Sequence, residues 1–438
     1  MHPQPVFAFS VLALTVGLSI GRPHIGRYRI QHAQAGLIGA ALTILLGIAP
    51  PEILGVAARL LLVPIVTIVS LMVITLVADR AGLFAALADF LARSAAGRGR
   101  VLFSSLFLTG TVLGTVFTND AAVLILTPLV FHLVERISGG KWSIENKLPF
   151  YFAVLYVANL VGGLVIANPI NIVVASLFGI GFGEYARWMF VPAVVSIAVT
   201  FAGLWIFFGA AIPKTYEQLP ALPLPGSTRL RWICAAILML TLGGFFAGPA
   251  IGVPTWAISV TAAAVLCAVH AAASREGLKP IVKGVGWDVL VFLCGMFIVG
   301  LGLRQAGLTR EIGDLIQRLS GGDYARMRLS TGLVAGTASA IINNHPTADM
   351  MAWVIQGLAL PGSEKRLFAF AALIGGDLGP KMLPIGSLAA LMWFRILRDK
   401  GVAIPYSLYI RVGVPVTLAA ILLSLLALNL EALLFRGL

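Results

Sequence analysis

Four short segments of this chain place polar side chains inside long apolar runs, and the last three named below also contain proline or glycine. They are residues 118–120, 166–171, 343–346 and 376–387. A carboxamide or a hydroxyl both donates and accepts hydrogen bonds, so these segments offer the groups that would bind a polar, uncharged solute. The candidate binding side chains are Asn119, Asn168, Asn171, Asn343, Asn344 and Ser387.

The same segments contain groups that can carry a charge or exchange a proton. Asp377 and Lys381 are four residues apart, which would place them on one face of a continuous helix. A charge at the centre of a membrane-spanning helix costs on the order of 2.5–3.5 kcal/mol, and pairing lowers that cost. The two residues are therefore either a structural ion pair or a pair that is proton-coupled or faces the substrate. Asp120 either caps a helix or exchanges protons, and the sequence assigns no role to His345.

The elements that must position these groups are membrane helices. Of the 438 residues, 59% are hydrophobic and only 11% are charged, and the mean hydropathy is +0.96. Such a composition excludes a soluble enzyme, a disordered chain and a disulfide scaffold. At roughly 20 apolar residues per crossing, the chain can form about ten to twelve transmembrane helices.

Basic residues and cysteines support the same interpretation. The net charge is +13, and the basic residues lie in short loops between apolar runs. This distribution is typical of the positive-inside rule, so it predicts a multi-pass protein of the inner (cytoplasmic) membrane rather than a nucleic-acid-binding protein. The three cysteines lie inside apolar runs and lack the spacing of a zinc site or a disulfide framework. The sequence indicates no metal and no cofactor.

Two apolar runs, residues 103–134 and 329–360, carry a polar segment in the middle. Irregular backbone is tolerated within a membrane only where it lines a cavity or is buried in protein, so each run is predicted to be a re-entrant hairpin. A span interrupted by proline or glycine follows each hairpin, at about 149–180 and 367–396. Broken helices expose backbone groups and partial charges at the break, which suits a site at the membrane midplane.

An internal repeat relates the two hairpins. A shift of 225 residues aligns 76–120 with 301–345, where ten of 45 positions are identical and Asn119 falls opposite Asn344. The number of crossings between the copies makes them run in opposite directions. The sequence therefore predicts an inverted-topology repeat, the usual construction of secondary transporters.

The predicted fold is an all-α polytopic membrane protein. It has about ten transmembrane helices plus two re-entrant hairpins in an inverted repeat, with broken helices at the midplane. The N-terminal spans occupy residues 1–50 and the first repeat occupies residues 51–212. A proline-rich linker at 213–230 leads to the second repeat at 231–438.

Three segments resemble a known family: FTNDAAVLILTPLV at 117–130, NPINIVVASLFGIGFGEYA at 168–186 and GDLGPKMLPIGSLAALMW at 376–393. They resemble the ArsB-type arsenite efflux permeases of the ion transporter superfamily, and the resemblance runs nearly from end to end. INNHPT at 342–347 is similar to the second hairpin tip of that family. The resemblance implies a secondary transporter that exports arsenite and antimonite, as neutral trihydroxides, from the cytoplasm in exchange for protons.

With this function in view, the six amide and hydroxyl residues named above are expected to bind the substrate. Asp120 and Asp377 are expected to carry protons, with Lys381 as their partner. Members of the family work alone or with a cytoplasmic ATPase subunit. This chain has no Walker A pattern, so it is itself expected to be a transporter and not an enzyme.

Two other functions stay open. Sodium-coupled carboxylate symporters of the same superfamily carry Ser-Asn-Thr at both tips, where this chain has Thr118-Asn119-Asp120 and Asn343-Asn344-His345. The exchange of hydroxyls for titratable groups favours protons over sodium. An intramembrane aspartyl protease would use two buried aspartates and a GxGD motif, but Ile374-Gly375-Gly376 precedes Asp377, so the first glycine is absent.

Overall fold

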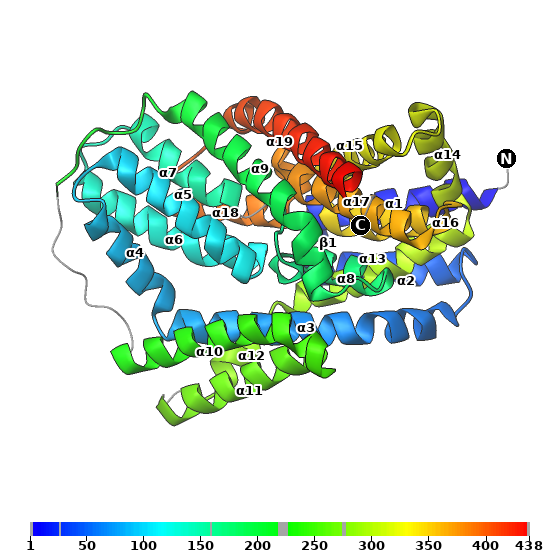
Figure 1. The fold of residues 1–438 in the computed structure, drawn as a ribbon, viewed down its shortest axis with the longest axis horizontal. Coiled ribbons are helices and arrows are strands. Elements are labelled where there is room, and N and C mark those ends of the chain that lie inside the picture. Colours follow the sequence, from blue (N-terminus) through cyan, green and yellow to red (C-terminus); the bar gives the residue numbers. More distant parts are fainter. Residues whose placement is uncertain (1–2, 26–27, 158–159, 218–226, 274–276, 436–438) are drawn as a thin grey trace.

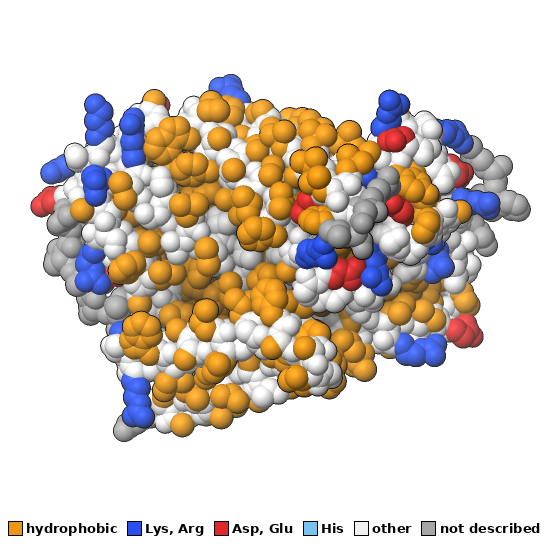
Figure 2. Space-filling model, in the orientation of Figure 1, with side chains coloured by type: hydrophobic (Ala, Val, Ile, Leu, Met, Phe, Trp, Pro, Cys, Tyr) orange, Lys and Arg blue, Asp and Glu red, His pale blue; other side chains and the backbone are white. Residues whose placement is uncertain are grey.

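The computed structural model describes residues 3–25, 28–157, 160–217, 227–273 and 277–435. Over these residues the chain folds into nineteen α-helices, a few 3-10 turns and one pair of two-residue strands (Figure 1). Seven helices are long and apolar enough to cross a membrane. Hydrophobic side chains cover most of the face seen in Figure 2. The predicted all-helical membrane fold is confirmed.

The N-terminal region forms a helical pair and one long helix. α1 (Pro3–Gly21) and α2 (His32–Leu45) are joined by the antiparallel strands β1 (His24–Ile25) and β2 (Tyr28–Arg29), and both helices pack against a later helix, α13 (Trp287–Gln305). α3 (Ile53–Arg80) follows and runs along the lower side of the molecule in Figure 1.

The next region contains the first predicted hairpin and the first predicted broken span. Two helices meet at Phe117 and Thr118, which are both extended, inside the run predicted as a hairpin. A 3-10 turn interrupts the run predicted as a broken span, and Pro169 begins the helix that follows it, at the first helical position that proline favours. The elements are α4 (Leu83–Ser94), α5 (Gly99–Val116), α6 (Asn119–Ser138), α7 (Ile144–Val157), η1 (Val165–Ala167), α8 (Pro169–Leu177) and α9 (Phe182–Phe208).

A group of helices lies between the two halves in sequence and packs at the lower edge of the molecule (Figure 1). α10 (Thr228–Ala247), η2 (Gly248–Ile251) and α11 (Thr255–Ala273) lie along α3, and α12 (Lys279–Gly284) leads into α13. The predicted linker at 213–230 falls between α9 and α10, and its residues 218–226 lie outside the described part of the chain.

The second half follows the same order of elements. α15 and α16 meet at Asn343, and two 3-10 turns interrupt the span predicted at 367–396. The elements are α14 (Leu308–Ser320), α15 (Tyr324–Ile342), α16 (Asn344–Gly357), α17 (Gly362–Leu378), η3 (Gly379–Lys381), η4 (Pro384–Gly386), α18 (Leu388–Asp399) and α19 (Tyr406–Leu434).

Corresponding helices of the first and second halves begin at equivalent positions. Gly82 and Gly307, with φ of 79° and 83°, precede α4 and α14 in the left-handed conformation that glycine adopts without strain. A shift of 225 residues relates the first residues of α5 and α15 and also those of α6 and α16. The opposite orientation of the two halves stays a prediction.

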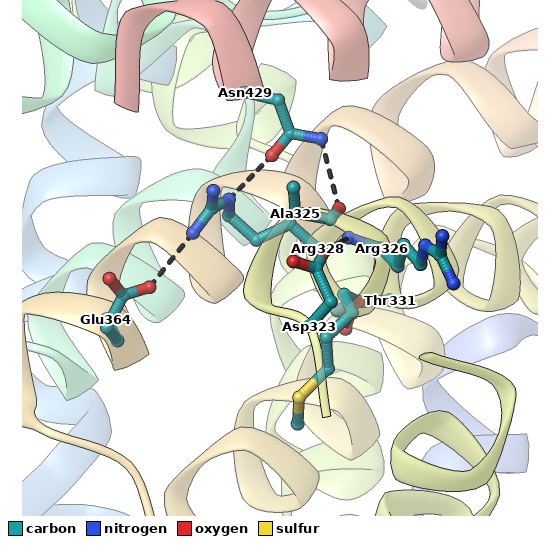
Figure 3. A network of polar contacts seen from close by, with 8 residues as sticks. Asp323, Ala325, Arg326, Arg328, Thr331, Glu364 and Asn429 are labelled. Atoms are coloured by element: carbon teal, nitrogen blue, oxygen red, sulfur yellow. Dashed lines mark hydrogen bonds and ion pairs between the residues drawn. The ribbon is translucent and has the colours of Figure 1, made fainter. Parts of the chain in front are cut away.

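The second hairpin is fixed against its neighbours at its base. A Cβ at Gly375 of α17 would overlap the carbonyl oxygen of Gly332 on α15, so these two backbones are in contact. Arg328 of α15 is 1% exposed and donates from Nε to Asn429 Oδ1 at 2.7 Å and from Nη1 to Glu364 Oε2 at 2.9 Å. Figure 3 shows this guanidinium reaching between α17 and α19. α15, α17 and α19 are therefore held together by packing and by buried polar contacts.

Candidate functional site

The carboxylate of Asp377 joins the two broken spans. Its Oδ1 accepts a hydrogen bond from Asn168 Nδ2 at 2.8 Å, and its Oδ2 accepts from Asn171 Nδ2 and from the backbone N–H of Gly162, both at 3.2 Å. Asp377 and Asn171 are 0% exposed and Asn168 is 3% exposed. Three of the residues predicted from sequence thus lie together, although more than 200 residues separate Asp377 from the two asparagines.

The local sequence explains how the two asparagines are held. Asn168 is the N-cap of α8, where its Oδ1 accepts from the Ile170 N–H at 3.3 Å, and Pro169 occupies the first helical position, which it favours. Both ends of the Asn168 amide are therefore engaged. A Cβ at Gly162 would lie 2.6 Å from Asn171 Nδ2, so glycine at this position leaves room for the Asn171 amide.

Hydrogen-bonding capacity remains at this site. An ionised carboxylate has about four lone-pair sites, and described residues occupy three of those of Asp377. Asn171 Oδ1 is buried and has no hydrogen-bond partner among the described residues. A buried acceptor left without a donor costs about 1–3 kcal/mol. The site can therefore accept two O–H or N–H donors from a polar solute.

Lys381 is buried near Asp377 but does not contact it. Its Nζ donates to the Tyr156 carbonyl oxygen at 3.5 Å and lies 5.3 Å from the centroid of the Tyr156 ring. Among the described residues no carboxylate lies within the 4.0 Å of an ion pair, although Asp377 attracts the ammonium through space. The predicted helical face does not form because α17 ends at Leu378, and η3 carries Lys381 away from it.

The tip of the second hairpin is buried and internally bonded. Asn343, with φ of 80°, is the N-cap of α16, and its Oδ1 accepts from the His345 N–H at 3.3 Å. Asn344 Oδ1 lies 2.9 Å from His345 Nδ1. All three residues are less than 9% exposed. The oxygen atoms of both amides are thus engaged at the tip, which leaves their Nδ2 groups to bind a solute.

The first hairpin tip is described only in part. α6 begins at Asn119, but the side chains of Asn119 and Asp120 lie outside the described part of the structure. The preceding residue, Thr118, is 1% exposed, and its Oγ1 has no partner among the described residues. The backbone therefore breaks where the sequence predicts, and the predicted roles of Asn119 and Asp120 stay predictions.

Ser387 occupies the place in the second half that Asn168 occupies in the first. It follows a 3-10 turn, caps α18 by accepting from the Ala390 N–H at 3.3 Å, and is 2% exposed. The second hairpin contacts both breaks, since α15 packs against η3 and η4, and α16 packs against α8. Ser339 of α15 also donates to the Gly376 carbonyl oxygen at 2.8 Å, beside Asp377.

A cavity of about 390 Å³ adjoins the first break. It is lined in part by Val165 and Ile166 of η1, Ser176 of α8 and Thr67 of α3. One water occupies about 30 Å³ of liquid volume, so the cavity has room for a solute of several heavy atoms.

Sequence reasoning missed three contributors to this site. Gly162 acts through a backbone N–H, which every residue type but proline carries, and Tyr156 acts through a backbone carbonyl, which every residue type carries. The pair Gly162-Gly163 inside an apolar run was the one signal that could have pointed to Gly162. Thr118 was visible as part of the tip but was not assigned a function. Among the described residues no group of three or more His, Cys, Asp or Glu is placed to hold a metal ion.

The similarities of this chain to known proteins extend over nearly its whole length. The family model described as ArsB, arsenical pump membrane protein, matches residues 7–431. An arsenical pump membrane protein of Escherichia coli is 33% identical over 97% of this chain and 99% of its own length. A putative arsenical pump membrane protein of Bacillus subtilis is 22% identical over 90% of this chain and 93% of its own. The YdaH transporter of Alcanivorax borkumensis has a similar fold, with a TM-score of 0.59, 17% identity and 98% coverage of both chains.

Proposed function

The chain belongs to the ArsB family of arsenical pump membrane proteins, and from this premise we propose that it exports arsenite and antimonite from the cytoplasm in exchange for protons. The protein is a multi-pass inner-membrane transporter of the ArsB type. The substrates are proposed to move as neutral trihydroxides. The observation that carries the proposal is the buried Asp377 carboxylate held by the amides of Asn168 and Asn171.

A neutral trihydroxide suits the groups that remain free at this site. Each hydroxyl donates one hydrogen bond, and both the fourth lone-pair site of Asp377 and the Oδ1 of Asn171 can accept one. A hydrogen bond between neutral groups contributes about 0.5–1.5 kcal/mol, and one to a charged group about 1.5–3 kcal/mol. Binding of this strength is reversible, as transport requires.

The remaining substrate ligands are proposed from both hairpin tips and the second break. Asn343 and Asn344 would donate from Nδ2 to the substrate oxygens, because their Oδ1 atoms are engaged at the tip. Asn119 is proposed as the equivalent ligand of the first tip, on the predicted repeat. Ser387 is proposed as the equivalent of Asn168, since both cap the helix after a break.

Competition at one carboxylate would couple the substrate to protons. Ionised Asp377 accepts hydrogen bonds, whereas protonated Asp377 is a donor with less capacity to accept, so a proton and a substrate hydroxyl exclude each other. Mutual exclusion is what antiport needs. One proton moving down 100 mV supplies about 2.3 kcal/mol, which sustains a gradient of roughly fiftyfold for a neutral solute. Lys381 is proposed to favour ionised Asp377 by long-range attraction, and Asp120 is proposed as a second proton carrier.

The two alternative functions fit this site less well. A carboxylate substrate would meet the buried carboxylate of Asp377 with like charge. An aspartyl protease needs a second carboxylate beside the first, but the partners of Asp377 within the described residues are amides and a backbone N–H. A cytoplasmic ATPase subunit stays a prediction from the family resemblance.

Transport by everted membrane vesicles tests the proposal. We expect vesicles that contain the protein to accumulate arsenite when a pH gradient is imposed. Asp377→Asn and Asp120→Asn should abolish that accumulation, because neither amide takes up a proton at neutral pH. Asp314→Asn is the control, since Asp314 is exposed on α14. If both test variants still respond to the pH gradient like the control, the assignment of the proton carriers is wrong.

A further inference from the structure

Three buried aromatic rings lead away from the tip of the second hairpin. The ring centroids of His345 and Phe292 are 6.3 Å apart, and those of Phe292 and His32 are 5.8 Å apart. The residues belong to α16, α13 and α2 and are 3%, 1% and 4% exposed. They form a line from the proposed binding site to the loop between α1 and α2, which the positive-inside rule predicts to be cytoplasmic.

His345 presents a free base at the inner end of this line. Its Nδ1 lies 2.9 Å from Asn344 Oδ1 and 3.3 Å from Asn343 Oδ1, and because both are acceptors, the ring proton is on Nδ1. Its Nε2 then carries a lone pair, which is buried and has no partner among the described residues. Asp349, one turn further along α16, is 4% exposed. A buried imidazole with an unused lone pair is placed to take up a proton.

His32 at the outer end is held as a neutral imidazole. The Arg22 guanidinium can only donate, so it meets the lone pair on His32 Nε2, and His32 Nδ1–H donates to Ser19 Oγ at 2.7 Å. Arg22 interacts electrostatically with Arg29, Arg395 and Asp288, which places it near charged groups of three other segments. A proton that arrives at His32 is repelled by Arg22, and among these groups Asp288, which is exposed, is the one that can accept it.

The Phe292 ring is in contact with both imidazoles, and its backbone position is fixed. A Cβ at Gly36 of α2 would lie 3.0 Å from the Phe292 Cα, and one at Gly295 would overlap the backbone of Gly36. The backbones of α2 and α13 are therefore in close contact from Phe292 to Gly295. Because the helices cannot move apart locally, rotation of the Phe292 ring is the motion that would open the line.

We propose that His345 and His32 form the cytoplasmic branch of the proton path and that the Phe292 ring closes it. This inference rests on the proposed proton-coupled export. When the ring turns aside, a water enters and takes the Nε2 proton from the His345 imidazolium. The resulting hydronium gives a proton to His32 Nε2 as Arg22 withdraws, and His32 releases it to solvent. The first transfer breaks an N–H bond of His345 and forms an O–H bond of hydronium. The second breaks that O–H bond and forms an N–H bond at His32, and both imidazoles are neutral again once His32 has released its proton.

Two transport assays on the purified, reconstituted protein test this path. Exchange of labelled for unlabelled arsenite needs binding and movement of the substrate but no net transfer of protons. Uptake driven by a pH gradient needs both. For His345→Gln and His32→Gln we expect gradient-driven uptake to fall by about a hundredfold, the scale of a lost proton-transfer group. Exchange should be unchanged in His32→Gln, whereas His345→Gln should also lower exchange to a smaller extent, because His345 holds the Asn344 amide. His270→Gln is the control, because His270 is also buried but lies on α11.

The gate is tested separately with Phe292→Ala. Liposomes that contain this variant should leak protons in the absence of arsenite, as measured with an entrapped pH-sensitive dye. Phe297→Ala is the matched control, since Phe297 is a buried phenylalanine of the same helix.

Each outcome decides the proposal. Selective loss of gradient-driven uptake supports it, and retained exchange shows that the variant is folded. Equal loss in both assays for the two histidine variants, or wild-type behaviour in both, would overturn it. Failure of wild-type protein to respond to the pH gradient would instead refute the proposed function.

Discussion

Replacement of Arg328 by methionine tests whether the base of the second hairpin is held by its buried polar contacts (Figure 3). Methionine keeps most of the volume of the arginine stem but removes the guanidinium. The change leaves Glu364 and Asn429 without bonds of 2.9 Å and 2.7 Å. Each hydrogen bond to a charged group contributes about 1.5–3 kcal/mol, and loss of one partner of a buried ion pair costs about 3–5 kcal/mol.

We therefore expect Arg328→Met to lower the free energy of unfolding by about 3–5 kcal/mol. The measurement is chemical denaturation of the purified protein in detergent micelles, followed by circular dichroism. Arg326→Met is the matched control, because Arg326 lies on the same helix but is exposed, and its cost should stay within about 0.5 kcal/mol. The two substitutions remove the same charge from the same segment.

A second variant isolates the contact itself. Because Arg328 and Glu364 interact directly, the cost of Arg328→Met combined with Glu364→Gln should be smaller than the sum of the single costs, by at least about 1 kcal/mol. Additive costs, or equal stability of Arg328→Met and Arg326→Met, would refute the view that this contact holds α15 against α17.

Two glycine substitutions test the packing next to Asp377. Gly162→Ala should abolish transport while the protein still accumulates in the membrane, because the added Cβ would displace the Asn171 amide. Gly163→Ala is the control and should stay active in the vesicle assay, because the nearest neighbour of its Cβ would be the Ala193 Cβ at 3.4 Å. Gly375→Ala should prevent accumulation of folded protein, as judged by size-exclusion chromatography, because the added Cβ would overlap the backbone of α15. Gly376→Ala should behave like wild type, because the nearest atom to its Cβ would be 3.9 Å away. Equal behaviour within either pair would contradict the packing described.

Much of the fold could be predicted from the sequence because hydrophobic runs and proline positions report directly on membrane helices. Of the seven long apolar helices, α5 belongs to the first predicted hairpin. The remaining six, together with the shorter α1 and α2 and the two interrupted spans, give the predicted number of about ten transmembrane segments. Asn119 and Asn344, which the internal repeat aligns with each other, are the first residues of α6 and α16.

The parts of the site that are made by side chains could be predicted from the sequence, whereas the contacts made by backbone groups could not. Asn168, Asn171 and Asp377 could be grouped, because amides and a carboxylate inside apolar runs need one another. The contact expected between Asp377 and Lys381 was wrong, because a spacing of four implies contact only within a continuous helix, and α17 ends between them. Nothing in the residue pattern could reveal that Tyr156 contributes a carbonyl oxygen.

The separation of Lys381 from Asp377 has a consequence for the proposed transport cycle. A direct ion pair would occupy lone-pair sites of the carboxylate, whereas an ammonium held at the Tyr156 carbonyl leaves those sites to amides and substrate. The pair still sums to zero charge when Asp377 is ionised. With a neutral substrate bound, the site then moves outward without net charge, and the membrane potential does not oppose it. With a proton in place of the substrate, the site carries one positive charge from Lys381, and a potential negative inside draws it back at about 2.3 kcal/mol per 100 mV. In this cycle the membrane potential acts on the return step alone, where it adds to the pH gradient, and it has no effect on the outward step that carries the neutral substrate.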